Sequence, residues 1–143
     1  AEKGGMGMRG EYTHVIDAKG RLFIPAKFRD ELGYSFVITK GLSRCLSIYP
    51  MQEWERFEAK INALPTRQAR SLQLFFIASS QDCELDGQGR VLIPQKLREY
   101  AGLDKNTVVA GMTDHIEVWD ESEWNAMELT PESIAGIMEE AGI

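Results

Sequence analysis

Cysteine and histidine are scarce in this sequence of 143 residues, which contains only two of each. The cysteines, Cys45 and Cys83, are too few for a disulfide framework, and neither lies near the other or near a histidine in the sequence. We therefore expect a reducing compartment, with no disulfide scaffold and no metal site. The sequence also lacks any apolar run close to the roughly 20 residues needed to cross a bilayer. We expect a cytoplasmic protein without a membrane partner.

Residues 1–7, which read AEKGGMG, lack the basic start and the apolar centre of a targeting signal. We expect them to form a flexible leader, with a remnant of cloning as one interpretation. The folded part of the chain is therefore expected to be residues 8–143.

Lysine and arginine are absent from the last 24 residues, which hold seven acidic side chains. The whole chain has a net charge of −6, so residues 1–119 together carry +1. A negative total normally argues against nucleic-acid binding, but here the acidity belongs largely to the tail. We expect residues 128–143 to form a mobile acidic helix or tail, with Thr130 as its N-cap and Pro131 at the first helical position.

The motifs of the common enzyme classes are also missing. The sequence has no nucleophile elbow, no phosphate-binding loop and no metal-ligand spacing. The Gly-x-Gly of DGQGR lacks the third glycine and the long helix of a dinucleotide site. His14 and His115 each lie in strand-like sequence, where an edge or surface position is the commoner explanation. We therefore expect a protein that is not an enzyme, with no cofactor and no small-molecule substrate.

A duplicated motif is what the sequence does contain. Residues 17–29 read DAKGRLFIPAKFR and residues 86–98 read DGQGRVLIPQKLR, and seven of the thirteen positions are identical. Similar apolar segments and a tryptophan, Trp54 or Trp124, follow each motif. The chain therefore reads as two copies of one unit, at about residues 8–64 and 79–127, joined by a helical connection at residues 66–77.

Each copy reads as strand, tight turn, strand, short helix, strand, turn, strand and then the helix that carries the tryptophan. β-Branched and aromatic residues flank the turn, in which aspartate can bond the backbone and glycine can adopt positive φ, so we expect a hairpin at residues 17–20 and at residues 86–89. Pro25 and Pro94 then end the second strand and begin the short helix.

Neither copy is large enough to hide much apolar surface, because about 50–55 residues is near the lower limit for independent folding. Two like units that close their strands edge to edge would form a small barrel and remove exposed edges. We therefore predict a single α+β domain, mainly β, made of two pseudo-symmetric halves with peripheral helices.

The two motifs carry a family resemblance. Asp-x-x-Gly-Arg followed by x-x-Ile-Pro and a basic helix, present twice, with Gly-Glu-Tyr near the start and Ile-Glu-Val-Trp near the end, resembles the bacterial MraZ family over most of residues 8–125. The resemblance implies a double-split β-barrel of two swapped-hairpin halves, as in the AbrB-like group. It also implies a nucleoid-associated transcriptional regulator of the division and cell-wall gene cluster, including its own promoter, that assembles into a homo-oligomeric ring.

Two interpretations of each motif are open. In the structural one, Asp17 and Asp86 bond the turn backbone, Gly20 and Gly89 supply its geometry, and the arginines only pair with the aspartates. In the functional one, the rigid turn orients an arginine whose planar fork binds phosphate or the guanine edge at two points. We predict that Arg21 and Arg90 are the principal DNA contacts, with Lys19 beside Arg21. The remaining candidates serve either phosphate contact or a solvated helix face: Lys27, Arg29, Lys96 and Arg98.

One turn that neutralises a few phosphates would give only non-specific affinity, about 10⁻⁴ to 10⁻⁶ M. Linked copies add about 10² to 10⁴ in avidity, so an oligomer should read short direct repeats in a promoter. The acidic tail would either prevent indiscriminate binding or compete for the basic surface. The rival hypothesis is an interaction module in which the hairpins mediate contacts between subunits.

Overall fold

The computed structural model describes residues 7–143, so the expected leader lies outside the described residues apart from Gly7. The fold is α+β, with most strands in one antiparallel sheet. The first copy contains β1 (Met8–Val15), β2 (Arg21–Phe23), α1 (Ala26–Leu32), β3 (Ser35–Lys40), the 3₁₀ turn η2 (Leu42–Arg44), β4 (Leu46–Pro50) and α2 (Met51–Asn62).

The connection and the second copy follow in the predicted order. The connection is α3 (Thr66–Leu72), which continues into the π-helical segment η3 (Gln73–Ile77). The second copy contains β5 (Gln81–Glu84), β6 (Arg90–Leu92), α4 (Gln95–Tyr100), β7 (Asn106–Thr113), β8 (Ile116–Asp120) and α5 (Glu121–Ala126), and α6 (Pro131–Ala141) ends the described chain.

The two copies exchange strands. The six-stranded sheet has the order β1-β7-β8-β4-β3-β5, so the first strand of each copy pairs with the third strand of the other. β4 and β8 meet at the centre of this sheet, and β2 and β6 pair with each other as a separate two-stranded ribbon. Each copy therefore completes the sheet of the other, and the whole arrangement has pseudo-two-fold symmetry.

The two predicted hairpins, around residues 17–20 and 86–89, are wrong because their flanking strands do not pair with each other. In the first, β1 pairs with β7 and β2 with β6, and the two flanking segments share one isolated bridge, between Ile16 and Leu22. In the second, β5 pairs with β3 and β6 with β2. Only the tips keep hairpin geometry: the Asp17 N–H donates to the Arg21 carbonyl at 3.0 Å, and the Asp86 N–H donates to the Arg90 carbonyl at 2.8 Å. Among the described residues the strands form a six-stranded sheet and a two-stranded ribbon, without a closed ladder around a barrel.

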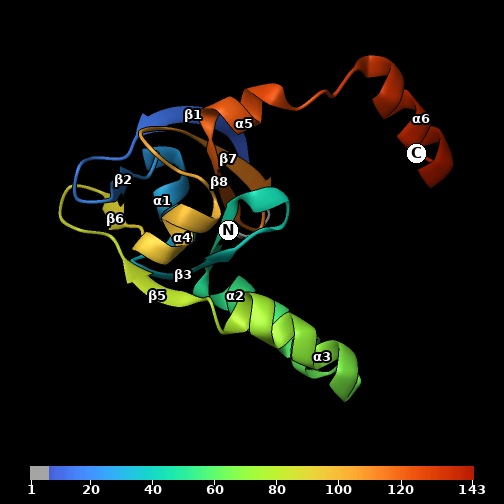
Figure 1. Cartoon of the computed structure of the whole chain (residues 1–143), viewed down its shortest axis with the longest axis horizontal. Coiled ribbons are helices and arrows are strands. Elements are labelled where there is room, and N and C mark those ends of the chain that lie inside the picture. The colour runs from blue at the N-terminus through green and yellow to red at the C-terminus, as the bar shows by residue number, and fades with distance from the viewer. Residues whose placement is uncertain (1–6) are drawn as a thin grey trace.

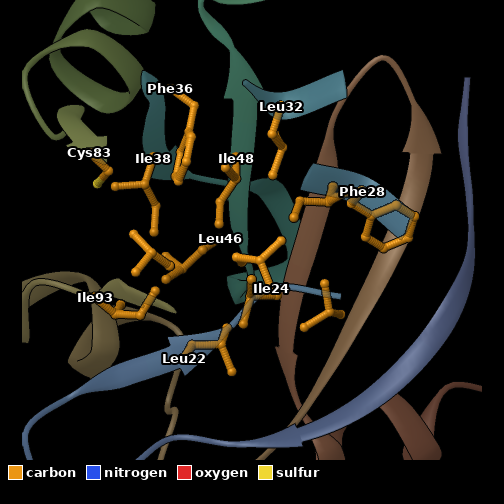
Figure 2. Packing of buried hydrophobic residues seen from close by; sticks show 14 of the residues in the cluster. Leu22, Ile24, Phe28, Leu32, Phe36, Ile38, Leu46, Ile48, Cys83 and Ile93 are labelled. Atoms are coloured by element: carbon orange, nitrogen blue, oxygen red, sulfur yellow. The ribbon is translucent and has the colours of Figure 1, made fainter. Parts of the chain in front are cut away.

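The hydrophobic core lies between the large sheet, the ribbon and the short helices (Figure 2). Leu22 and Val91 of the ribbon are 0% and 1% exposed, and Phe28 of α1 and Leu97 of α4 are also buried. Burying a side chain of this size stabilises the fold by about 1.5–3 kcal/mol. The core thus fixes one face of the ribbon and leaves the other face outward.

The longer helices lie at the periphery. α2 buries Trp54 and Ile61 and contacts β3 and β4, whereas α3 contacts α2 and η3, so the helical pair extends away from the sheet (Figure 1). α6 stands apart from the rest of the molecule, and every residue from 128 to 143 is exposed. The Thr130 side chain caps α6 by accepting from the Ser133 N–H at 3.1 Å. Within residues 7–143, the helices are all too short or too polar to span a membrane.

Candidate functional site

The first turn is built by Asp17. Its Oδ1 accepts from the backbone N–H groups of Lys19 and Arg21, both at 2.9 Å, and its Oδ2 accepts from Arg21 Nε at 2.7 Å. Gly20 closes the turn with its N–H donating to the Asp17 carbonyl, at a φ of 85°. The backbone and the arginine side chain are therefore held by one carboxylate.

The second turn repeats this geometry. Asp86 Oδ1 accepts from the N–H groups of Gln88 at 2.8 Å and Arg90 at 2.9 Å, and Oδ2 accepts from Arg90 Nε at 2.9 Å. Gly89 has a φ of 79°. The two turns thus present two arginines in the same local conformation.

Hydrogen bonding lowers the pKa of both aspartates. The largest cause is the bond from the backbone N–H of Arg21 for Asp17, and of Arg90 for Asp86, with the guanidinium adding to it. Both carboxylates are therefore ionised at neutral pH, and each offsets part of the charge of its arginine.

The ribbon brings the two turns together. In its register Arg21 lies opposite Leu92 and Phe23 lies opposite Arg90, so these four side chains share the outward face. Arg90 Nη1 lies 3.8 Å from Asp17 Oδ2, and the turns emerge side by side at one end of the molecule (Figure 1). An open hollow of about 490 Å³ borders the face and is lined in part by Arg21, Arg90 and Tyr34.

The other basic candidates fall into two groups. Lys19 is exposed at the tip of the first turn, and Lys27 and Lys96 are exposed on α1 and α4. Arg29 and Arg98 are half-buried, and each donates its Nε to a backbone carbonyl, that of Ile24 at 2.8 Å and that of Ile93 at 3.0 Å. Sequence reasoning grouped all four helix residues together, but only the lysines point freely to solvent.

Sequence reasoning missed the apolar residues on the same face. Leu92 is 58% exposed and Tyr34 is 66% exposed, and Phe23 is partly covered by the His14 ring, 5.3 Å away between centroids. The signal was present in the alternation of the strands, which places Phe23 two residues after Arg21 and Leu92 two residues after Arg90.

Among residues 7–143, no cluster of three or more His, Cys, Asp or Glu side chains could hold a metal ion. Both cysteines are buried and unpaired, and burial raises the pKa of Cys45 to about 12, so its thiol is protonated at neutral pH. What the two turns do present is a pair of oriented guanidinium groups.

Comparison with known proteins agrees with the duplication. A protein-family model described as "MraZ protein, putative antitoxin-like" matches residues 8–75 and again residues 76–137. The transcriptional regulator MraZ of Moorella thermoacetica is 56% identical over 117 residues, 80% of this chain and 82% of that protein. The protein of the same name from Lachnoclostridium phytofermentans is 48% identical over 136 residues, 94% of this chain and 96% of that protein. The resemblance predicted from the two motifs is confirmed, and this chain belongs to the MraZ family.

Proposed function

We propose that this chain is a sequence-specific DNA-binding transcriptional regulator that reads DNA through Arg21 and Arg90. One observation carries the proposal: two rigid turns lie side by side, and each holds its arginine by the Nε atom. That bond uses one of the five N–H donors of a guanidinium, so the terminal amino groups keep donors for a partner, although Arg90 Nη1 also lies 3.8 Å from Asp17 Oδ2. The printed name of the relatives, transcriptional regulator, supports the same class of function.

Base edges suit these arginines better than phosphates do. The charge of each guanidinium is already paired with an aspartate, so a neutral acceptor pair such as guanine O6 and N7 is favoured over a second anion. A two-stranded ribbon has the width to enter the major groove, and each well-placed arginine would contribute about 1–3 kcal/mol of discrimination. Lys19, Lys27 and Lys96 are exposed and suited to phosphate contact.

The finer architecture is part of the same proposal. The exchange of β1 and β5 between the copies supports a double-split β-barrel of two swapped-hairpin halves that fold as one domain. We further propose that the protein forms a homo-oligomeric ring in the cytoplasm, associated with the nucleoid. Several turns would then bind one promoter with short direct repeats, including that of its own division and cell-wall gene cluster.

A binding-site selection from genomic DNA tests this function. We expect the chain to enrich a short repeated element, with an apparent affinity that falls linearly with salt in a log–log plot. The variant Arg21→Ala with Arg90→Ala should lose binding to the selected DNA in a gel shift while its circular dichroism spectrum stays unchanged. Arg67→Ala with Arg70→Ala, an equal loss of charge at two exposed positions on α3, is the matched control.

The interaction module is the second candidate, because exposed Leu92 and Tyr34 flank the arginines. Light scattering on the same samples separates the two hypotheses. If the double variant keeps its DNA affinity but changes its oligomeric mass, the turns bind subunits and the proposed function is wrong.

A further inference from the structure

Arg29 lies against the turn of the other copy. The Ile24 N–H donates to the Gly89 carbonyl at 3.0 Å, and the Ile24 carbonyl accepts from Arg29 Nε at 2.8 Å. The guanidinium rests so closely on Gly89 that a Cβ added there would be 2.5 Å from Arg29 Cζ. We name Ile24, Arg29 and Gly89 the first latch.

The second latch has the same construction with the copies exchanged. The Ile93 N–H donates to the Gly20 carbonyl at 2.8 Å, and the Ile93 carbonyl accepts from Arg98 Nε at 3.0 Å. A Cβ on Gly20 would be 2.9 Å from Arg98 Cζ. Ile93, Arg98 and Gly20 therefore form the second latch, which holds the turn that carries Arg21.

We infer that Arg29 and Arg98 are positioning residues, each for the reading arginine of the opposite copy. Arg29 fixes the turn that carries Arg90, and Arg98 fixes the turn that carries Arg21. The inference rests on the proposed function for its consequence in DNA recognition, although the latches themselves are features of the fold. It replaces phosphate contact as the role of these two residues.

The chemistry of arginine explains the latch. A planar guanidinium can lie flat on a glycine Cα while its Nε donates sideways to a carbonyl, which the flexible ammonium of lysine does less well. In the first latch the ring of Phe23 also covers the guanidinium, with Cζ 4.4 Å from the ring centroid. Arg29 is thus held by a carbonyl, a ring and a turn, whereas its neighbour Lys27 is exposed.

The latches also explain why the second arginine of the motif is the same in both copies. Asp, Gly and the first Arg build the turn, and the second Arg builds the latch with the glycine of the other copy and with the backbone of its own Ile. The glycine has two functions, because its positive φ closes its own turn and its missing side chain admits the opposite arginine.

Amide hydrogen exchange tests the latches without DNA. In Arg29→Ala we expect Gly89 and Arg90 to exchange roughly 5- to 10-fold faster, the equivalent of about one lost hydrogen bond, with Gly20 and Arg21 unchanged. Arg98→Ala should show the reverse. Lys27→Ala and Lys96→Ala, which remove the same charge from the same helices, should change neither turn. The inference would be overturned if either arginine variant speeds amide exchange in the turn of its own copy, or in neither turn.

A conservative variant guards against loss of folding. Arg29→Lys keeps the charge and the aliphatic stem, so the core under α1 is retained. We expect the turn at residues 86–90 to exchange faster in this variant as well, because the planar fork is gone. If lysine protects that turn as well as arginine does, charge alone is sufficient and the latch assignment fails.

Affinity for the selected DNA gives a separate readout. We expect Arg29→Ala to be non-additive with Arg90→Ala but additive with Arg21→Ala, since Arg29 acts through the opposite turn. Its salt slope should equal that of the wild type, whereas a lost phosphate contact would reduce the slope by about 0.9. A reduced slope with additive effects would return Arg29 to phosphate contact. If the wild type binds no DNA, the proposed function fails while the exchange experiment still decides the latch.

Discussion

The two turns share one backbone and differ at their tips. Aspartate, glycine and arginine occupy the same places in both and make matching hydrogen bonds. Lys19 at the tip of the first turn corresponds to Gln88 in the second, and Phe23 on the outward face corresponds to Leu92. Identical residues therefore build the two turns, whereas these two pairs of differing residues are exposed. Equal scaffolds with unequal tips suit a partner whose two halves are not identical.

The ion pairs around the two aspartates also make the first turn more positive than the second. Asp17 lies 2.7 Å from its own Arg21 and also 3.8 Å from Arg90 of the other copy. Asp86 pairs with Arg90 at 2.9 Å. Arg90 is thus placed between two carboxylates and Arg21 beside one, so the first turn presents the more positive surface, with Lys19 added to it.

Substitution of the turn glycines should have the largest effect on stability. We expect Gly89→Ala to lower the free energy of unfolding by about 2–3 kcal/mol, from about 1–2 kcal/mol of left-handed strain and about 1 kcal/mol for the displaced Arg29 hydrogen bond. Gly20→Ala should cost somewhat less, because Arg98 leaves more room there. Urea unfolding at neutral pH measures both.

Gly102 provides the matched control for these variants. It also has a positive φ, of 63°, but a Cβ there would meet nothing within 4 Å. Gly102→Ala should therefore show the strain alone, about 1–2 kcal/mol. Equal losses for Gly89→Ala and Gly102→Ala would mean that the guanidinium moves aside without cost and that Arg29 does not hold the turn of the other copy.

The order of elements could be predicted from sequence, because alternation, helical spacing and turn residues are local signals. The partners of the strands could not. β1 has the same half-buried pattern whether it pairs with β2 or with β7, and only the exchange of strands between copies decides which. The sequence also did not predict that α2 and α3 extend away from the sheet. Trp54 and Ile61 indicate that one face of α2 is buried, but they do not specify how far the helices extend.

In the candidate site, too, the local contacts could be predicted from the sequence and the contacts between the copies could not. Aspartate and glycine act within their own turn, so the motif alone indicated their geometry. Arg29 and Arg98 act on glycines 60 and 78 positions away along the chain, at Gly89 and Gly20, and no local pattern distinguishes them from the exposed lysines nearby. Long-range contacts of this kind become visible only when the two copies are placed in space.

Exchange of the tip residues tests whether the turns contribute unequally to DNA binding. Lys19→Gln makes the first tip resemble the second, and we expect several-fold weaker binding with a salt slope reduced by about 0.9, as for one lost phosphate contact. Gln88→Lys should tighten binding and steepen the slope by a similar amount. Gel shifts over a salt series measure both, and an unchanged slope in the two variants would show that neither tip meets a phosphate.

The titration of Asp17 and Asp86 gives the smallest effect and tests what builds the turns. Both carboxyl groups have a pKa below the ordinary value of 3.8. Because the pKa is lowered on folding, each ionised carboxylate stabilises the folded state at pH values above its ordinary pKa. This contribution is lost as the pH falls through the pKa of the folded state. Carbon NMR titration between pH 5 and pH 2 should follow both groups.

Alanine variants of the arginines then separate the effect of the backbone N–H from the effect of the guanidinium on the pKa of each aspartate. The backbone N–H of Arg21 is the largest cause of the lowered pKa of Asp17, and it survives in Arg21→Ala. The pKa of Asp17 should therefore rise in this variant but stay below its ordinary value, and Asp86 should behave likewise in Arg90→Ala. The turn would then form without the guanidinium, as the proposed role of the arginine in DNA binding requires. A pKa that returns fully to 3.8 would instead make the arginine a part of the turn itself.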